Sequence, residues 1–324
     1  MSENRNTEQL KTEFENFYQT VLEPKFADIE AIRKKYLRYF IFGIFMVFVL
    51  LPIICIVLFG IFLLQNTDEY FYQSQFSADE IFFGLLIITA IISSPIFFYK
   101  KHAKKAVMPE FIKYFGDFKY TYMGTIDKDI IYKSLLFDTF NQRKGDDYFS
   151  GIYLNTKMTI SEEDLTYITI RDKKLHVKQI FKGIIIQLEM NKNFSSKTVV
   201  FKDKGIFNFL QQSGGLQKVA LEDSIFEKEF EVYSNDQLEA RYLLTTAFME
   251  RMLAVRNAYK TNKIQFSFFD NSLLIAINTP KNMFESTSLF RKTTDRKIIN
   301  QAFEQFLSVM SIIELLKLNQ RTGF

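Results

Sequence analysis

The chain of 324 residues has no tryptophan, one cysteine and only two histidines. Cys55 therefore cannot form an intrachain disulfide. His102 and His176 lie far apart in the sequence without neighbouring cysteine or histidine, so the sequence predicts no metal site of the zinc type. The chain also has no glycine-rich phosphate-binding loop and no Gly-x-Ser-x-Gly elbow. We therefore expect no cofactor and no metal.

Charged residues are absent from two long apolar runs, residues 39–64 and 81–99. With a rise of about 1.5 Å per residue, helices of these lengths can cross a hydrocarbon core about 30 Å thick. The segment between them, residues 65–80, carries acids but no lysine or arginine. The sequence thus predicts a transmembrane hairpin over residues 39–99 with an external loop.

Basic residues flank both runs on their outer sides, which predicts the orientation of the hairpin. The flanking residues are Arg33, Lys34, Lys35, Arg38, Lys100, Lys101, Lys104 and Lys105. Because cytoplasmic flanks are enriched in lysine and arginine, both ends of the chain should be cytoplasmic. The prediction is a multi-pass protein of the bacterial inner membrane, with the bilayer as a partner. The net charge of +4 is explained by these lysines, so no nucleic acid is expected.

An amphipathic helix is predicted before the first run, within residues 1–38, with an interruption at Pro24. Its apolar stripe could pack against helices of the same chain, or against another protein or a second copy. Residues 100–125 follow the hairpin as a basic helix. In the predicted spans, Thr89, Ser93 and Ser94 should bond to carbonyl groups of their own helix.

The sequence pattern predicts a cytoplasmic α+β domain for residues 126–324. A β meander is expected first, because short segments rich in β-branched and aromatic residues alternate with polar breaks. Its strands are 151–160, 165–170, 175–181, 183–190 and 197–201. A strand at 226–233 should follow, and then a helix to about Tyr259 that begins with a capping box of Ser234 and Gln237. A hairpin at 264–278 and a helix at 294–318 complete the order strand, helix, hairpin, helix.

Polar residues near the predicted capping box are the natural candidates for catalysis. They are Asp236, Glu239, Arg241 and Glu250. Asp236 already suits the dipole of the helix, and Glu239 and Arg241 do not share a helical face, so structural roles are favoured. The acids at 146–147 and 162–164 could bind a hard cation, but they lack the alternating ligand spacing of a calcium loop. We interpret them as solvated loop residues and predict no catalytic site.

Several stretches resemble a bacterial membrane-protein family catalogued as domain of unknown function 3137. The longest is Phe226-Glu-Lys-Glu-Phe-Glu-Val-Tyr-Ser-Asn-Asp-Gln-Leu-Glu-Ala-Arg-Tyr242. The others are Ser134-Leu-Leu-Phe137, Phe181-Lys-Gly183, Met249-Glu-Arg251 and Leu318-Asn-Gln-Arg321. The resemblance implies an N-terminal segment, a transmembrane hairpin and this C-terminal region. It implies no activity.

Three functional hypotheses follow from the sequence. The first is a non-enzymatic, membrane-tethered interaction or scaffold module. The second is a membrane-bound hydrolase or transferase that uses polar residues of the helix at 234–251. The third is a lipid-binding protein, which would need an apolar cavity.

Overall fold

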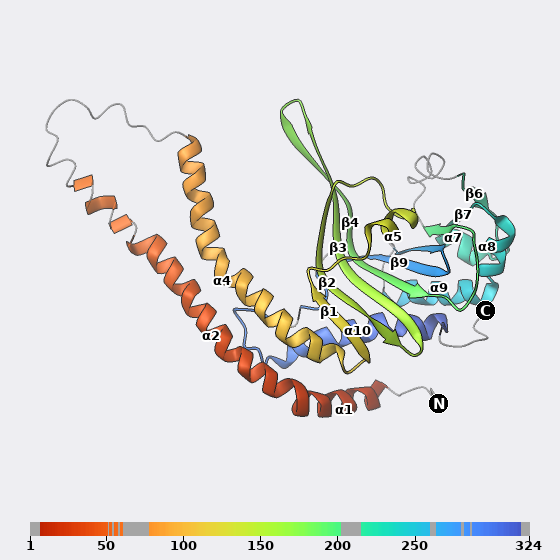
Figure 1. Cartoon of the computed structure of the whole chain (residues 1–324), viewed down its shortest axis with the longest axis horizontal. Coiled ribbons are helices and arrows are strands. Elements are labelled where there is room, and N and C mark those ends of the chain that lie inside the picture. The colour runs from red at the N-terminus through yellow and green to blue at the C-terminus, as the bar shows by residue number, and fades with distance from the viewer. Residues whose placement is uncertain are drawn as a thin grey trace. The chain divides into compact units, whose positions relative to one another are not determined.

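The computed structural model describes residues 7–50, 52–53, 55–57, 59–60, 78–201, 215–259, 264–279, 282–285 and 287–318. The chain divides into two compact units. Unit 1 comprises Met1–Val107 and Thr287–Arg296, and unit 2 comprises Met108–Ser286 and Lys297–Phe324. Figure 1 shows the helices of unit 1 in red to orange and the sheet of unit 2 in yellow to blue. Each unit is described by itself.

Unit 1 is built from helices. They are α1 (Thr7–Phe17), the π-helix η1 (Tyr18–Leu22), α2 (Glu23–Phe45), the π-helix η2 (Met46–Leu50) and most of α4 (Ala78–Ile112). The predicted interruption at Pro24 is confirmed, because a π-helical segment precedes it and the proline occupies the first turn of α2. Proline fits there because the first turn has no hydrogen-bond partner for its N–H.

The apolar stripe of the N-terminal helices is buried in the single chain. Leu22 and Phe26 are fully buried, and Phe14, Tyr18 and Ile29 are nearly so. The Arg296 guanidinium lies 3.7 Å from the centre of the Tyr18 ring. A further partner at this helix stays a prediction.

The transmembrane hairpin is not supported. Among the described residues, no helix combines the length and the apolar character needed to cross a membrane. In the first run, α2 ends at Phe45 and η2 follows it directly. In the second, α4 begins at Ala78, covers residues 81–99 and continues through the lysines to Ile112. The predictions of a multi-pass protein and of an inner-membrane localisation with both ends cytoplasmic are therefore wrong. Most of the predicted external loop, residues 65–77, lies outside the described residues.

Unit 2 contains a nine-stranded antiparallel sheet, which confirms the predicted α+β class. The strands are β1 (Asp117–Tyr122), β2 (Gln142–Tyr153), β3 (Thr156–Arg171), β4 (Lys174–Glu189), β5 (Thr198–Phe201), β6 (Gln217–Val219), β7 (Glu231–Ser234), β8 (Ile264–Phe269) and β9 (Ser272–Asn278). Their order in the sheet is β1-β2-β3-β4-β9-β8-β5-β7-β6. The predicted hairpin at 264–278 is confirmed, with Asp270 and Asn271 at positive φ in its turn.

Helices accompany the strands of unit 2. They are α5 (Lys128–Lys133), α7 (Ser224–Glu229), α8 (Gln237–Leu243), α9 (Thr246–Ala258) and α10 (Arg296–Leu316). The predicted C-terminal helix is confirmed by α10, which runs alongside the sheet in Figure 1. Its Phe306 is fully buried, with its ring centre 5.1 Å from that of Phe149 and 4.3 Å from that of Phe284. These aromatic contacts form part of the core.

The segment predicted as a strand at 226–233 is instead divided between α7 and β7. Asp223 accepts hydrogen bonds from the backbone N–H groups of Ile225 and Phe226 and so begins a helical turn. Phe226 and Phe230 are four residues apart, and both are buried. The alternation of apolar and acidic residues is compatible with either structure, and the cap favours the helix.

Of two predicted breaks in the meander, one differs from the structure and one agrees with it. The acidic stretch 161–164 is not a turn but the middle of the 16-residue strand β3. The true turn before β3 is at Leu154 and Asn155, both with positive φ. The predicted break at 171–174 is confirmed as the turn between β3 and β4.

Candidate functional site

The candidate catalytic residues have identifiable structural roles. Asp236 begins α8 by accepting hydrogen bonds from the N–H groups of Leu238 and Glu239. The predicted helix start at Ser234 is thus two residues early. The Glu239 carboxylate accepts hydrogen bonds from the N–H groups of Ser195, at 3.1 Å, and Ser196, at 2.6 Å. Burial raises the pKa of Glu239, but these hydrogen bonds lower it by more, so the net pKa is lowered.

Arg241 and Glu250 lie at different places. The Arg241 guanidinium donates to the carbonyl oxygen of Ala220 and to the Gln237 side chain, both at 3.4 Å. Glu250 is exposed on α9. The predicted single helix is divided, because Thr245 accepts a hydrogen bond from Phe248 N–H and starts α9. These positions favour scaffolding roles over a common catalytic cleft.

The basic residues that were expected to flank a membrane differ in burial. Arg33 is 8% exposed, and its guanidinium bonds to the Glu30 carboxylate and to the Leu289 carbonyl oxygen. Lys104 is fully buried. Lys34, Lys35, Arg38 and Lys105 are exposed, and Lys100 and Lys101 are half-buried. Arg33 and Lys104 therefore belong to the interior of the protein.

Three carboxylate side chains from β2 and β3 lie close together. Asp146, Asp147 and Glu162 each have a carboxylate oxygen within 4.8 Å of the others. The pairing shifts between Gly145 and Tyr148, so the two aspartates occupy a β-bulge opposite Glu162. Such oxygen ligands could hold a hard cation. Sequence reasoning placed these acids in solvated loops, whereas Asp147 and Glu162 are buried in strands.

Protein donors already bind each carboxylate of this cluster. The Tyr120 hydroxyl donates to Asp147 at 2.7 Å, the Asn282 amide to Asp146 at 2.8 Å, and Met283 N–H to Glu162 at 2.9 Å. Burial, and then the charge of Asp147, raise the pKa of Tyr120, so its phenol stays protonated and remains a donor. These contacts are sufficient to give the cluster a structural role.

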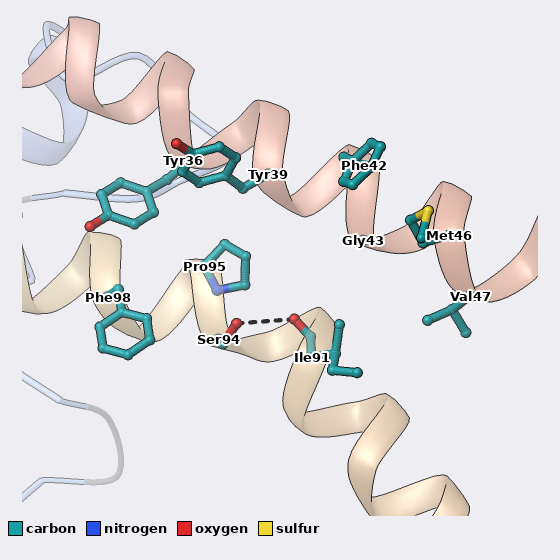
Figure 2. Close-up of a pocket in the computed structure, with 10 residues that line it drawn as sticks. All are labelled: Tyr36, Tyr39, Phe42, Gly43, Met46, Val47, Ile91, Ser94, Pro95 and Phe98. Atoms are coloured by element: carbon teal, nitrogen blue, oxygen red, sulfur yellow. Dashed lines mark hydrogen bonds between the residues drawn. The ribbon is translucent and has the colours of Figure 1, made fainter. Parts of the chain in front are cut away.

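An apolar groove lies between α2 and α4 within unit 1, with a volume of about 840 Å³. Figure 2 shows the lining residues on α2, η2 and α4, with Ser94 bonded to the Ile91 carbonyl oxygen at 3.1 Å. The lining residues are Tyr36, Tyr39, Phe42, Gly43, Met46, Val47, Ile91, Ser94, Pro95 and Phe98. The Ser94 bond confirms the predicted pairing of this hydroxyl with its own helix, as do those of Thr89 and Ser93.

Polar groups gather at one end of this groove, which we call the α2–α4 groove. Tyr36 and Tyr39 carry its phenolic hydroxyls, and the Lys35 ammonium lies 5.9 Å from the centre of the Tyr39 ring. Arg38 is exposed on the same turns of α2. The residues toward the other end, including Phe42 and Met46, are apolar. These residues form a groove only because α2 and α4 pair, and the sequence analysis did not predict this groove.

The fold and these sites define an α+β protein with a nine-stranded antiparallel sheet and a helical unit that carries an apolar groove. Residues 179–318 match the family described as "Protein of unknown function (DUF3137)". The match supports, over these residues, the family identified from the sequence.

Two further comparisons add little. No curated protein matches the chain. Among solved structures, the crystal structure of the mycobacterial trehalose monomycolate transport factor A, TtfA, matches 64% of this chain and 92% of that chain. The sequence identity is 11% and the TM-score is 0.33. A likeness at this level carries no functional argument.

Proposed function

We propose that the protein is a non-enzymatic lipid-binding protein, and that the α2–α4 groove accepts the acyl chain of an anionic lipid. The observation that carries the proposal is the groove itself. Ligand pockets typically enclose about 300–1,000 Å³ and are mostly apolar with a few well-placed polar groups. The groove, at about 840 Å³, has this size and this distribution of polar groups.

The charge at one end of the groove favours an anionic head group. Lys35 and Arg38 are exposed beside the two tyrosines. The lining residues of α2 and η2 span Tyr36 to Val47, which is about 16 Å of helix at 1.5 Å per residue. An amphiphile could therefore place its head near the basic residues and its chain along the apolar wall.

Exposed apolar side chains on α2, η2 and α4 also support an apolar ligand. Phe42 is 60% exposed, Phe48 66% and Ile87 61%. Large exposed apolar side chains are typical of interaction sites when they gather on one surface. By contrast, the apolar stripe of α1 and η1, where a protein partner was expected, is buried in the chain. The groove is consequently the better-supported site.

The test fills the groove without disturbing the backbone. A Cβ built on Gly43 meets nothing within 4 Å, so Gly43→Leu places a side chain in the groove, and leucine also has the better helix propensity. Gly84 is the matched control, because it lies on α4 outside the groove lining and its Cβ also meets nothing within 4 Å.

Binding is measured with cis-parinaric acid, a fluorescent long-chain fatty acid, and separately with phosphatidylglycerol vesicles. Gly43→Leu should raise the Kd for the fatty acid by about tenfold or more, because a displaced apolar contact is worth about 1.5–3 kcal/mol. Gly84→Leu should not change it. Equal Kd values for Gly43→Leu and the wild type would refute the groove, as would vesicle binding that is unaffected by Gly43→Leu while no free fatty acid binds.

The head-group part has its own test. Lys35→Gln with Arg38→Gln should weaken binding of the fatty acid but not of the corresponding fatty alcohol, which lacks the negative charge. If both ligands lose affinity equally, the basic residues do not recognise the negative charge of the head group.

A further inference from the structure

The strands β3 and β4 extend beyond their neighbours in the sheet. The strand β2 pairs with β3 only up to Thr166, and β9 pairs with β4 only from Gly183. Residues 167–180 therefore form a two-stranded ribbon, here called the β3–β4 ribbon, which projects from the sheet in Figure 1 as the light-green loop. A two-stranded ribbon alone is only marginally stable in water, so its outer surface is suited to contact with a partner.

The tip of the ribbon has a defined conformation. Asp172 and Lys173 both have positive φ, at 50° and 59°, between the paired residues Arg171 and Lys174. Two central residues with positive φ are the mark of a type I′ turn, whose twist matches that of the flanking strands. The ribbon thus presents its side chains in a fixed arrangement.

One face of the ribbon is aliphatic. Ile168 is paired with Val177, and Ile170 with Leu175, so the four side chains lie on the same face. Ile170 is 73% exposed, Leu175 66% and Val177 61%. Neighbouring aliphatic side chains that stay exposed in the folded protein are typical of a surface that contacts a partner.

The tip and the opposite face are basic. Arg171, Lys173, Lys174 and Lys178 are exposed, and Asp172 is the only acid between them. Lys178 forms an ion pair with Asp138 at 2.9 Å. Within the described residues, the other three basic side chains form no ion pair. The ribbon therefore carries net positive charge at its tip, at the end of the aliphatic face.

We propose that the β3–β4 ribbon docks on an anionic lipid surface, with its aliphatic side chains in the interface and its basic side chains against the phosphates. Charge complementarity favours this occupant, because each lysine or arginine near an anionic surface contributes to binding. A second copy of the chain is disfavoured: the copy would carry the same positive charge, and four aliphatic residues are far fewer than the 20–30 residues per side of a stable interface.

This inference does not depend on the α2–α4 groove, and its test uses a probe that reports only on the ribbon. The single cysteine is removed by Cys55→Ser, and Ile168→Cys introduces a thiol on the aliphatic face of the ribbon for an environment-sensitive fluorophore. The labelled full chain is titrated with vesicles of phosphatidylcholine, with or without phosphatidylglycerol. The fluorophore should report a less polar environment only with the anionic vesicles, and added salt should weaken the response.

The decisive variant is Lys174→Glu with Leu175→Ser, which should lower the apparent affinity of the ribbon for anionic vesicles by at least about tenfold. The matched control is Ile152→Ser with Lys157→Glu, a pair of exposed residues opposite each other on β2 and β3, at the end of β3 that is far from the ribbon. Circular dichroism verifies that both variants fold.

Three outcomes would overturn the proposal. The first is an unchanged vesicle response in the ribbon variant, and the second is an equal loss in the control. The third is a fluorescence change that depends on protein concentration without lipid, which would assign the ribbon to contact between copies. If Gly43→Leu abolishes fatty-acid binding while the ribbon response persists, the groove and the ribbon are separate sites, and either can fail alone.

Discussion

Glu30 connects α2 to the segment 287–296 within unit 1 through a buried network. Its carboxylate accepts two hydrogen bonds from Arg33, at 2.7 and 2.9 Å, and two from Thr293, both at 3.0 Å. The Arg33 guanidinium also donates to the Leu289 carbonyl oxygen at 2.9 Å. Replacing Glu30 with glutamine keeps the size of the side chain but removes the charge that faces the guanidinium.

The magnitude follows from the pKa of Glu30. The hydrogen bond from Arg33 lowers it most, burial opposes this, and the hydrogen bonds from Thr293 lower it further, so it falls from 4.5 to about 2. At 1.36 kcal/mol per pH unit this corresponds to about 3 kcal/mol of folding free energy at neutral pH. The Glu30 side chain is 18% exposed, so solvent screens this interaction only in part. Glu30→Gln should therefore destabilise unit 1 by about 3 kcal/mol at pH 7.

The pH dependence has a definite sign. Because the folded pKa is lower than the unfolded one, the contribution is complete above about pH 5 and is lost as the pH falls toward the folded value of about 2. The stability difference between wild type and Glu30→Gln should therefore be constant near neutral pH and shrink in acid. The loss comes from protonation of Glu30 in the wild type, which the variant lacks.

Hydrogen–deuterium exchange of peptides from α2 measures the local free energy of opening in both proteins. Asp28→Asn is the matched control, since Asp28 is an exposed acid on the same helix. The prediction is wrong if α2 is as well protected from exchange in Glu30→Gln as in the wild type at pH 7. It also fails if the difference between them stays the same at about pH 3.

Two further predictions concern unit 2. Gly183→Ala should prevent stable folding, because Gly183 has a φ of 157° and a Cβ there would lie 2.0 Å from the Ile277 carbonyl oxygen. Urea denaturation tests this prediction. A variant that unfolds at the same urea concentration as the wild type would contradict it. Asp236→Ala should lower the free energy of unfolding by about 1 kcal/mol, because it removes the cap of α8. Asp236→Asn should retain most of the stability, since asparagine can accept the same hydrogen bonds. Equal losses of stability in the two variants would contradict a capping role.

Local signals in the sequence were sufficient for several elements. Pro24 places the start of α2, Asp270 and Asn271 form the turn between β8 and β9, and the apolar stripe of the C-terminal helix is buried as α10. Each of these signals acts over a few residues. Turn chemistry, proline geometry and side-chain periodicity have the same effect wherever the segment lies in the fold.

The candidate sites depended on contacts between distant residues. The acids at 146–147 and 162 face one another only because a bulge in β2 pairs with the middle of β3. The segment at 226–233 alternates as a strand would, yet the cap from Asp223 makes its first part helical. Neither outcome has a local signal strong enough to decide it.

The sequence by itself determined the α+β class, the family over residues 179–318, and those elements whose ends are marked by turns, caps or proline. Only the tertiary structure decided where α2 gives way to η2 within the described part of the first apolar run, how the groove forms between α2 and α4, and how the β3–β4 ribbon projects. The physical reason is range: backbone preferences act between near neighbours, whereas burial, cavities and strand register depend on residues that the chain brings together from far apart.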